Sequence, residues 1–196
     1  MKTKIILGTA NFVKGYGIRK SKGLDLRQIN NLNKVTSKNF INEIDTAYSY
    51  RGVEKKIGKS KFKNCKIYTK IPVVKLSQFH RKFVSRTVNK SLQRLKKKKL
   101  HGVFFHGAKN LMSIEGDKYY KDLLMLKKKK VIRKIGVSVY SPTELKNILK
   151  KYKFDMVQIP LNIFDRRFLK DNFLKKIKNS GIEIHARSIF MQGILL

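Results

Sequence analysis

Short runs of apolar residues recur along the chain, and longer segments of mixed apolar and polar residues separate them. Most of the runs are rich in isoleucine, valine and phenylalanine, as expected for strands buried on both faces of a parallel sheet. The pattern predicts seven strands, at Lys4–Thr9, Ile41–Asp45, Lys66–Lys70, Gly102–His106, Lys134–Ser138, Met156–Leu161 and Ile182–Ala186.

The segments between the predicted strands have apolar residues at helical spacing. One helix face is marked by Leu26, Ile29, Leu32 and Val35, a second by Phe79, Phe83, Val88, Leu92 and Leu95, and a third by Leu169, Phe173, Leu174 and Ile177. Gly181 can end the third helix. The sequence SPTE at 141–144 is the clearest helix start, because Ser141 can cap, proline suits the first helical position, and Glu144 can complete a capping box.

Strands that alternate with helices at intervals of roughly 20–40 residues predict a (β/α) fold. We expect one domain over residues 1–196, because no linker or low-complexity segment divides the chain. A closed barrel of this type has eight strands. The prediction is therefore an incomplete (β/α)8-type barrel of about seven units without the last strand and helix. Its two open edges favour self-association.

The formal net charge is +35, from 47 Lys and Arg against 12 Asp and Glu. Such a charge fits a polyanion partner, or a habit of placing lysine at solvated positions. The densest runs, Lys96–Lys99 and Lys127–Lys130, end predicted helices and contain no aromatic residue, so we expect no specific nucleic-acid binding. No run is long enough to span a membrane. The single cysteine, Cys65, fits the reducing cytoplasm.

Four residues with chemically useful side chains lie at or just after the ends of predicted strands. They are Asp45, Tyr50, Lys70 and His106. The carboxyl ends of parallel strands meet on one side of the sheet, so an acid, a phenol, an amine and an imidazole are expected to converge there and to transfer a proton. Taken singly, each residue has a structural explanation, and Tyr48 competes with Tyr50.

Several sequence motifs then indicate a family. The run DTAYSYRGVE, from Asp45 to Glu54, resembles the aldo-keto reductase signature DTAxxYGxxE. LGTANF from Leu7, IYTK ending at Lys70, KIGVSVYSPTEL from Lys134, QIPLN from Gln158 and the final ARSIFMQGILL follow in the family's order. The resemblance covers essentially the whole chain, and the last segment is similar to that of a bacterial subgroup acting on sugar-derived carbonyls.

The resemblance implies NADPH-dependent reduction of an aldehyde or ketone. Tyr50 would then be the proton donor. The positive charge of Lys70 would lower the pKa of the phenol, and Asp45 would hold the ammonium in place. His106 would orient the carbonyl group of a small substrate.

The same resemblance assigns cofactor-binding roles to residues at four strand ends. Gly8 and Thr9 would lie beside the nicotinamide ring, and Ser138 and Gln158 would bind its amide. Three further residues belong to the last segment: Arg187 replaces a tyrosine that stacks on the ring in many members, and Ser188 and Phe190 would approach the pyrophosphate.

The family's binding segment for the adenosine 2′-phosphate has no counterpart in this sequence. We therefore expect weak NADPH binding, or none, from this chain alone. Two other hypotheses stay open at this point. The chain could be a catalytically inactive barrel that serves as a binding or scaffold module, or a basic protein that binds polyanions.

Overall fold

The computed structural model describes residues 4–18, 20–74 and 82–196. Its centre is a sheet of seven parallel strands whose order in space is the order in sequence. The strands are β1 (Leu7–Gly8), β2 (Glu43–Asp45), β3 (Lys66–Ile71), β4 (Leu100–Phe105), β5 (Ile132–Ser138), β6 (Met156–Pro160) and β7 (Glu183–Arg187). All seven predicted strands are present, with ends that agree or are shifted by at most three residues.

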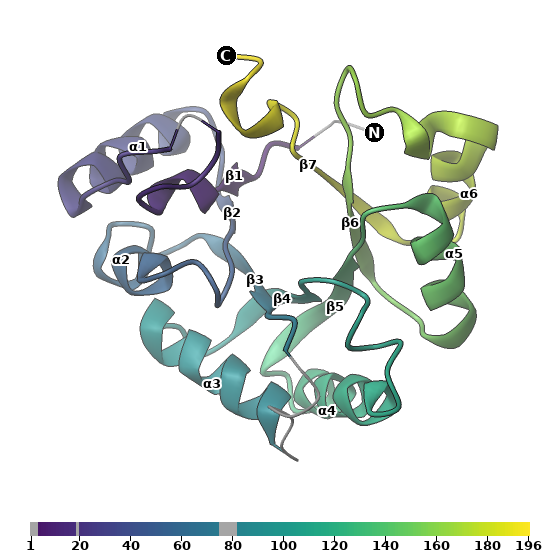
Figure 1. Cartoon of the computed structure of the whole chain (residues 1–196). Coiled ribbons are helices and arrows are strands. Elements are labelled where there is room, and N and C mark those ends of the chain that lie inside the picture. The colour runs from purple at the N-terminus through teal and green to yellow at the C-terminus, as the bar shows by residue number, and fades with distance from the viewer. Residues whose placement is uncertain (1–3, 19, 75–81) are drawn as a thin grey trace.

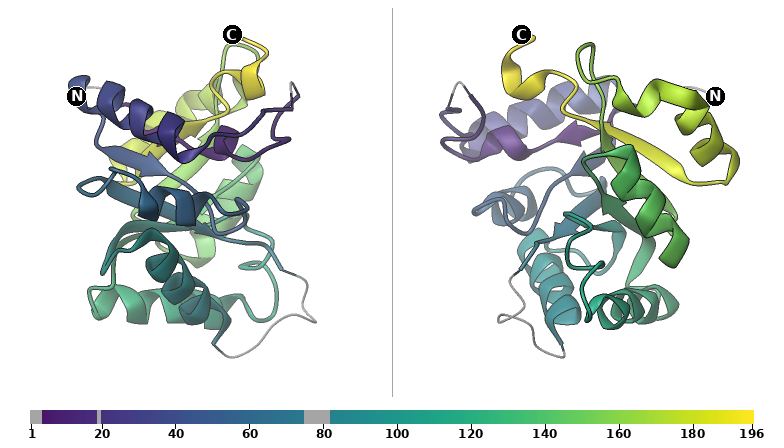
Figure 2. Two further views of the ribbon diagram at one scale, coloured as in Figure 1. Left: turned by 90° about the vertical axis from the view of Figure 1, so that its left-hand side faces the viewer. Right: turned by 45° about the vertical axis from the view of Figure 1, so that its right-hand side comes forward.

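Helices cover the outside of this sheet, as Figures 1 and 2 show. They are α1 (Leu26–Lys38), α2 (Val53–Lys59), α3 (Phe83–Leu95), α4 (Gly116–Lys128), α5 (Pro142–Lys151) and α6 (Phe173–Asn179). The sheet curls until β7 approaches β1, but these two strands are not paired (Figure 1). The prediction of an incomplete (β/α)8-type barrel is confirmed.

The helix starts follow local capping chemistry. The Ser141 hydroxyl accepts a hydrogen bond from the Glu144 N–H at 3.1 Å, as the SPTE sequence predicts. The Glu144 carboxylate accepts from the N–H of Tyr140 instead of that of Ser141, so this box is not the expected one. A reciprocal capping box is found at α1, between Asp25 and Gln28.

The predicted helix faces are only partly buried. Ile29 of α1 is fully buried, but Leu26 and Val35 are exposed, because α1 lies beside the edge strand β1 and its main helical neighbour is α2. Leu169 lies in a 3-10 segment before α6 and is exposed, whereas Gly181 follows α6 with a φ of +79°, as expected for a helix-ending glycine. Phe79 lies outside the described residues.

The barrel interior is packed by a separate small cluster of Tyr68, Phe104 and Met156. Glycines on two strands make room for it. A Cβ atom at Gly102 would lie 2.4 Å from the Met156 side chain, and one at Gly136 would lie 2.5 Å from the Phe104 ring. The large side chains of the interior therefore require glycine at these two strand positions.

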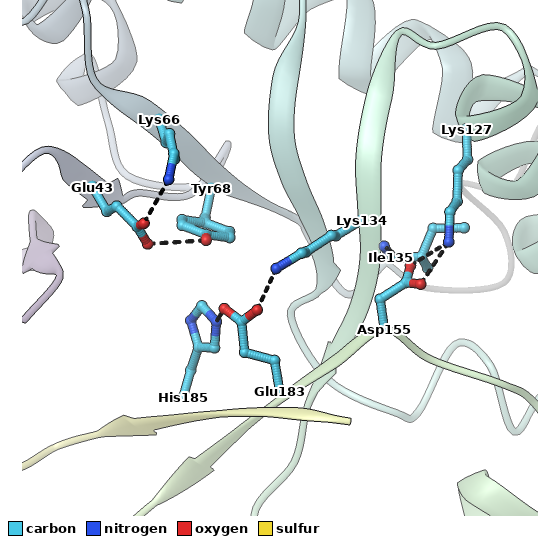
Figure 3. A network of polar contacts seen from close by, with 9 residues as sticks. All are labelled: Glu43, Lys66, Tyr68, Lys127, Lys134, Ile135, Asp155, Glu183 and His185. Carbon is cyan, nitrogen blue, oxygen red and sulfur yellow. Dashed lines mark hydrogen bonds and ion pairs between the residues drawn. The ribbon is translucent and has the colours of Figure 1, made fainter. Parts of the chain in front are cut away.

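The amino ends of the strands carry a polar network inside the barrel (Figure 3). The Tyr68 hydroxyl donates to Glu43 at 3.0 Å, and the carboxylate of Glu183 pairs with Lys134 and contacts His185 at 2.8 Å. The His185 ring packs edge-on against Tyr68, 5.0 Å between centroids. This network lies at the opposite end of the strands from Asp45 and Lys70, so His185 is used in it and not beside that pair.

Candidate active site

The four predicted residues are brought together at the carboxyl ends of neighbouring strands. Asp45 is the last residue of β2, Lys70 lies near the end of β3, and His106 follows β4 directly. Tyr50 lies in the turn before α2, which is held to β3 by a hydrogen bond from the Tyr48 N–H to the Lys70 carbonyl at 3.1 Å. Strand pairing thus places residues up to 61 positions apart at one end of the barrel, the end where the strands finish, which we call the mouth.

Lys70 and Asp45 form an ion pair in the floor of this mouth. The Lys70 Nζ atom donates to Asp45 Oδ2 at 2.5 Å and to the Thr46 carbonyl at 2.9 Å. Only 2% of the Lys70 side chain is exposed, and this burial lowers its pKa, while the charge of Asp45 opposes the effect. The pair holds the ammonium in a fixed position, because both of its partners are rigid parts of β2 and the turn after it.

Tyr50 lies over this pair. Lys70 Nζ is 5.6 Å from the centroid of the Tyr50 ring, and the ring of His106 is 6.0 Å away at an interplanar angle of 74°. Burial, and then the negative charge of Asp45, raise the pKa of the phenol above its ordinary value. This result contradicts the expectation that Lys70 lowers that pKa. The reason is that Asp45 already neutralises the ammonium, while burial penalises the phenolate.

The His106 imidazole is neutral at ordinary pH. Burial and the charge of Lys70 lower its pKa to about 4. The Ser49 Oγ atom lies 3.4 Å from His106 Nδ1. If the hydroxyl donates this hydrogen bond, the single ring proton is on Nε2, where it can be donated to a carbonyl oxygen.

The ring of the competing tyrosine, Tyr48, packs against Arg94. Its ring lies 4.2 Å from the guanidinium carbon of Arg94, on the side of α3. Arg94 also donates to the buried carboxylate of Glu54, which accepts a second hydrogen bond from the Thr69 hydroxyl. Glu54, the last residue of the DTAYSYRGVE signature, therefore joins α2 to β3 and α3. The spacing argument that favours Tyr50 agrees with this geometry.

Four of the residues expected at the nicotinamide ring surround the Lys70–Asp45 pair. The Thr9 hydroxyl donates to the Asp45 carbonyl at 3.0 Å, and Gly8 pairs with Asp45 across β1 and β2. Gln158 donates to Asp45 Oδ1 at 3.4 Å, and it pairs across β5 and β6 with the buried Ser138.

Two observations show that these residues fit an amide-bearing ring. Gln158 is 3% exposed, and its Oε1 atom has no hydrogen-bond partner among the described residues. Such an acceptor matches the N–H of a carboxamide. A Cβ atom at Gly8 would meet nothing within 4 Å, so the space above the first strand is open.

Of the three remaining predicted residues, Arg187 ends β7, and Ser188 and Phe190 follow it. The guanidinium carbon of Arg187 lies 4.4 Å from the centroid of the Tyr140 ring. Ser188 is exposed and has a φ of +57°, and its carbonyl accepts from Asn162 at 3.1 Å. Phe190 is 54% exposed. Arg187 is thus part of the mouth, while Ser188 and Phe190 lie on its outer rim.

Sequence reasoning missed several residues of the mouth. The Thr46 carbonyl fixes Lys70, Ser49 contacts His106, and the rings of Tyr16 and Tyr140 lie beside Tyr50 and Arg187, respectively. Ser49 lies within the recognised signature, so its place beside the tyrosine was a usable signal. Tyr16 lies in an irregular segment with no periodic pattern and gave none.

Comparisons with known proteins agree with this fold. An aldo-keto reductase from Bacillus halodurans, in its holo form, matches with a TM-score of 0.77 at 21% identity, over 98% of this chain and 64% of that one. The glycerol dehydrogenase from Gluconobacter oxydans matches with a TM-score of 0.73 at 25% identity, over 97% and 61%. This chain thus spans less than two thirds of either solved chain. No curated protein sequence matches it.

The family assignment rests on the sequence model. The model of the aldo/keto reductase family matches residues 4–196, nearly the whole chain. The order of the motifs, the barrel and the grouping of Asp45, Tyr50, Lys70 and His106 agree with that match. This chain therefore belongs to the aldo/keto reductase family.

Proposed function

We propose that this protein reduces an aldehyde or ketone to the alcohol, with NADPH as hydride donor and Tyr50 as proton donor. The observation that carries the proposal is the meeting of Tyr50, the Lys70–Asp45 pair and His106 at one mouth. Family membership supports oxidoreductase chemistry on carbonyl groups.

The phenol of Tyr50 is protonated at neutral pH, as reduction requires, and its raised pKa makes that proton harder to release. A phenol that resists ionisation is fully protonated at neutral pH, so every molecule carries the proton that the carbonyl oxygen needs. After the proton has left, Lys70 Nζ lies 5.6 Å from the ring centroid of the resulting phenolate, and Asp45 offsets its charge. Oxidation of an alcohol would require that phenolate at the start, and burial disfavours it.

His106 positions the substrate in this scheme. Its neutral imidazole can donate from Nε2 to the same carbonyl oxygen that takes the proton of Tyr50. Two donors that converge on one oxygen stabilise the negative charge that develops there during reduction.

The cofactor part of the proposal rests on Gly8, Thr9, Ser138 and Gln158. A bound nicotinamide would supply the hydride, and Ser138 and Gln158 would hold its amide. The unpaired Oε1 atom of Gln158 supports this placement. The choice of NADPH over NADH, and the roles of Ser188 and Phe190 at the pyrophosphate, come from the family resemblance.

The substrate is proposed to be a small carbonyl compound, and sugar-derived carbonyls are the class that the final segment suggests. One similar structure is named a glycerol dehydrogenase, and glycerol, like a reduced sugar, is a polyol. No helix in the described part of the chain is long and apolar enough to cross a membrane. A cytoplasmic location, a single domain over 1–196 and self-association through the edges of β1 and β7 stay predictions.

The test uses a pair of matched tyrosine variants. NADPH is titrated up to millimolar concentration while its fluorescence is followed, and turnover is measured with glyceraldehyde. Tyr50→Phe should still bind NADPH but lose at least a hundred-fold in kcat, the scale of general acid catalysis. Tyr48→Phe makes the same chemical change beside Arg94 and should turn over normally.

Other outcomes would reject the proposal. Turnover that survives Tyr50→Phe would remove this residue as proton donor. A folded chain that neither binds NADPH nor turns over would support the inactive scaffold hypothesis. Tight nucleic-acid binding with a steep salt dependence, unaffected by Tyr50→Phe, would support the polyanion hypothesis.

A further inference from the structure

Arg187 is a cation at the reacting end of the mouth. It is the last residue of β7, and Asp45 and Lys70 lie at the same ends of their strands. Burial raises the pKa of Tyr50 and lowers those of Lys70 and His106. Separately, the positive charge of Arg187 acts to lower the pKa of all three groups. The guanidinium is therefore close enough to influence all three groups that carry the proposed chemistry.

The guanidinium is held in place, and no described carboxylate forms an ion pair with it; Asp165 feels its charge from further away but is paired with Arg167. One Nη atom donates to the Val139 carbonyl at 3.3 Å, the other donates to the Ser188 hydroxyl at 3.3 Å, and the plane lies against the Tyr140 ring. Nε has no partner, and no carboxylate of the described residues lies within ion-pair distance of Arg187. By contrast, Lys70 in the same mouth is neutralised by Asp45.

We propose that Arg187 binds an anionic group, a carboxylate or a phosphate, carried by the carbonyl substrate. This inference rests on the proposed function and names its substrate class. A guanidinium retains N–H groups for an oxyanion after its two protein hydrogen bonds are counted, and its planar fork matches the oxygens of such a group. Stacking on Tyr140 fixes the plane before a ligand arrives, which reduces the entropy lost on binding.

A second source of the same chemistry is the pyrophosphate of the cofactor. The substrate is the favoured source because Arg187 ends β7 at the same mouth as Lys70 and His106, where the substrate carbonyl is proposed to lie, whereas Ser188 and Phe190, which the resemblance assigns to the pyrophosphate, are exposed further along the chain. The family resemblance implies instead that Arg187 stacks on the nicotinamide ring. Binding of the substrate anion and binding of the cofactor can be told apart, because an Arg187 variant would change the preference between substrates in the first case and the affinity for NADPH in the second.

The experiment compares two substrates that differ by one phosphate. Reduction of glyceraldehyde 3-phosphate and of glyceraldehyde is measured for the native chain, Arg187→Met and Arg187→Lys, with saturating NADPH. The native chain should prefer the phosphorylated compound, and Arg187→Met should lower the ratio of the two kcat/KM values by about ten- to hundred-fold. Arg187→Lys keeps the charge without the fork and should fall between them.

The control variant accounts for the high net charge. Lys150→Met removes one exposed positive charge from the last turn of α5 and should leave the ratio unchanged. A native ratio near one, or the same ratio in Arg187→Met, would overturn the proposal. A rise in the Kd for NADPH with an equal loss for both substrates would assign Arg187 to the cofactor.

A binding measurement separates this inference from the proposed function. Glycerol 3-phosphate and glycerol are titrated separately while the NMR signal of His106 is followed. A shift caused only by the phosphate, present in the native chain and lost in Arg187→Met, would support the anion site even if no substrate were reduced. Absence of turnover alone would then reject the reductase, whereas absence of the shift would reject the role of Arg187.

Discussion

The lowered pKa of His106 has a consequence for stability that can be measured without substrate or cofactor. In the unfolded chain this residue titrates near 6.5, and in the folded chain near 4, because burial and Lys70 disfavour the imidazolium. Between these two values the unfolded state binds more protons than the folded state. Stability from this residue is therefore complete above about pH 6.5 and is lost as the pH falls toward 4.

The magnitude follows from the two pKa values. At about 1.4 kcal/mol for each pKa unit, the whole difference corresponds to about 3 kcal/mol of unfolding free energy. About 2 kcal/mol of this amount is lost by pH 5. His106→Gln has no titrating ring, so its unfolding free energy should fall by that much less than that of the native chain between pH 7.5 and pH 5.

The assay is urea unfolding followed by circular dichroism at both pH values. All other titrating groups are common to the two chains, so their contributions cancel in the comparison. Equal losses of stability in the native chain and in His106→Gln would refute the reasoning. An NMR titration offers a second check. The His106 signal is identified as the one that the His106→Gln variant lacks, and a pKa near 6.5 for this signal in the native chain would also refute the reasoning.

Three further predictions test other parts of the structure. Lys70→Met should abolish turnover and raise the pKa of His106, which NMR titration would show, because the positive charge of Lys70 lowers that pKa; an unchanged pKa would place Lys70 away from the ring. The hydrogen bond with His185, and then the ion pair with Lys134, hold the pKa of Glu183 at about 2. Glu183→Gln should therefore cost about 1–2 kcal/mol above pH 4.5, after allowance for its 36% exposure, and this difference should disappear as the native chain is brought toward pH 2. Equal stabilities in urea at pH 6 would contradict this prediction. Gly58→Ala should destabilise the fold by about 1–3 kcal/mol in urea unfolding, since its Cβ would lie 2.2 Å from the Arg94 carbonyl, whereas Lys59→Ala next to it should change little.

The sequence by itself determined the order of elements and the residue types available for chemistry. Apolar runs of β-branched residues predicted all seven strands, because strands buried on both faces have few polar positions to obscure the pattern. Asp45, Lys70 and His106 could be placed at one mouth, because parallel strands end on the same side of a sheet. The choice of Tyr50 over Tyr48 depended on the spacing of a family signature.

The tertiary structure alone decided how these groups act on one another. The direction of the pKa shift of Tyr50 depends on burial and on a nearby Asp45 already paired with Lys70, and neither follows from positions in the sequence. The charge of Arg187 beside Tyr140 is unpaired because none of the carboxylates in the described part of the chain lies within a few ångströms of it. Pairing, desolvation and missing counter-ions are properties of distances in space, and a linear pattern of residues does not contain those distances.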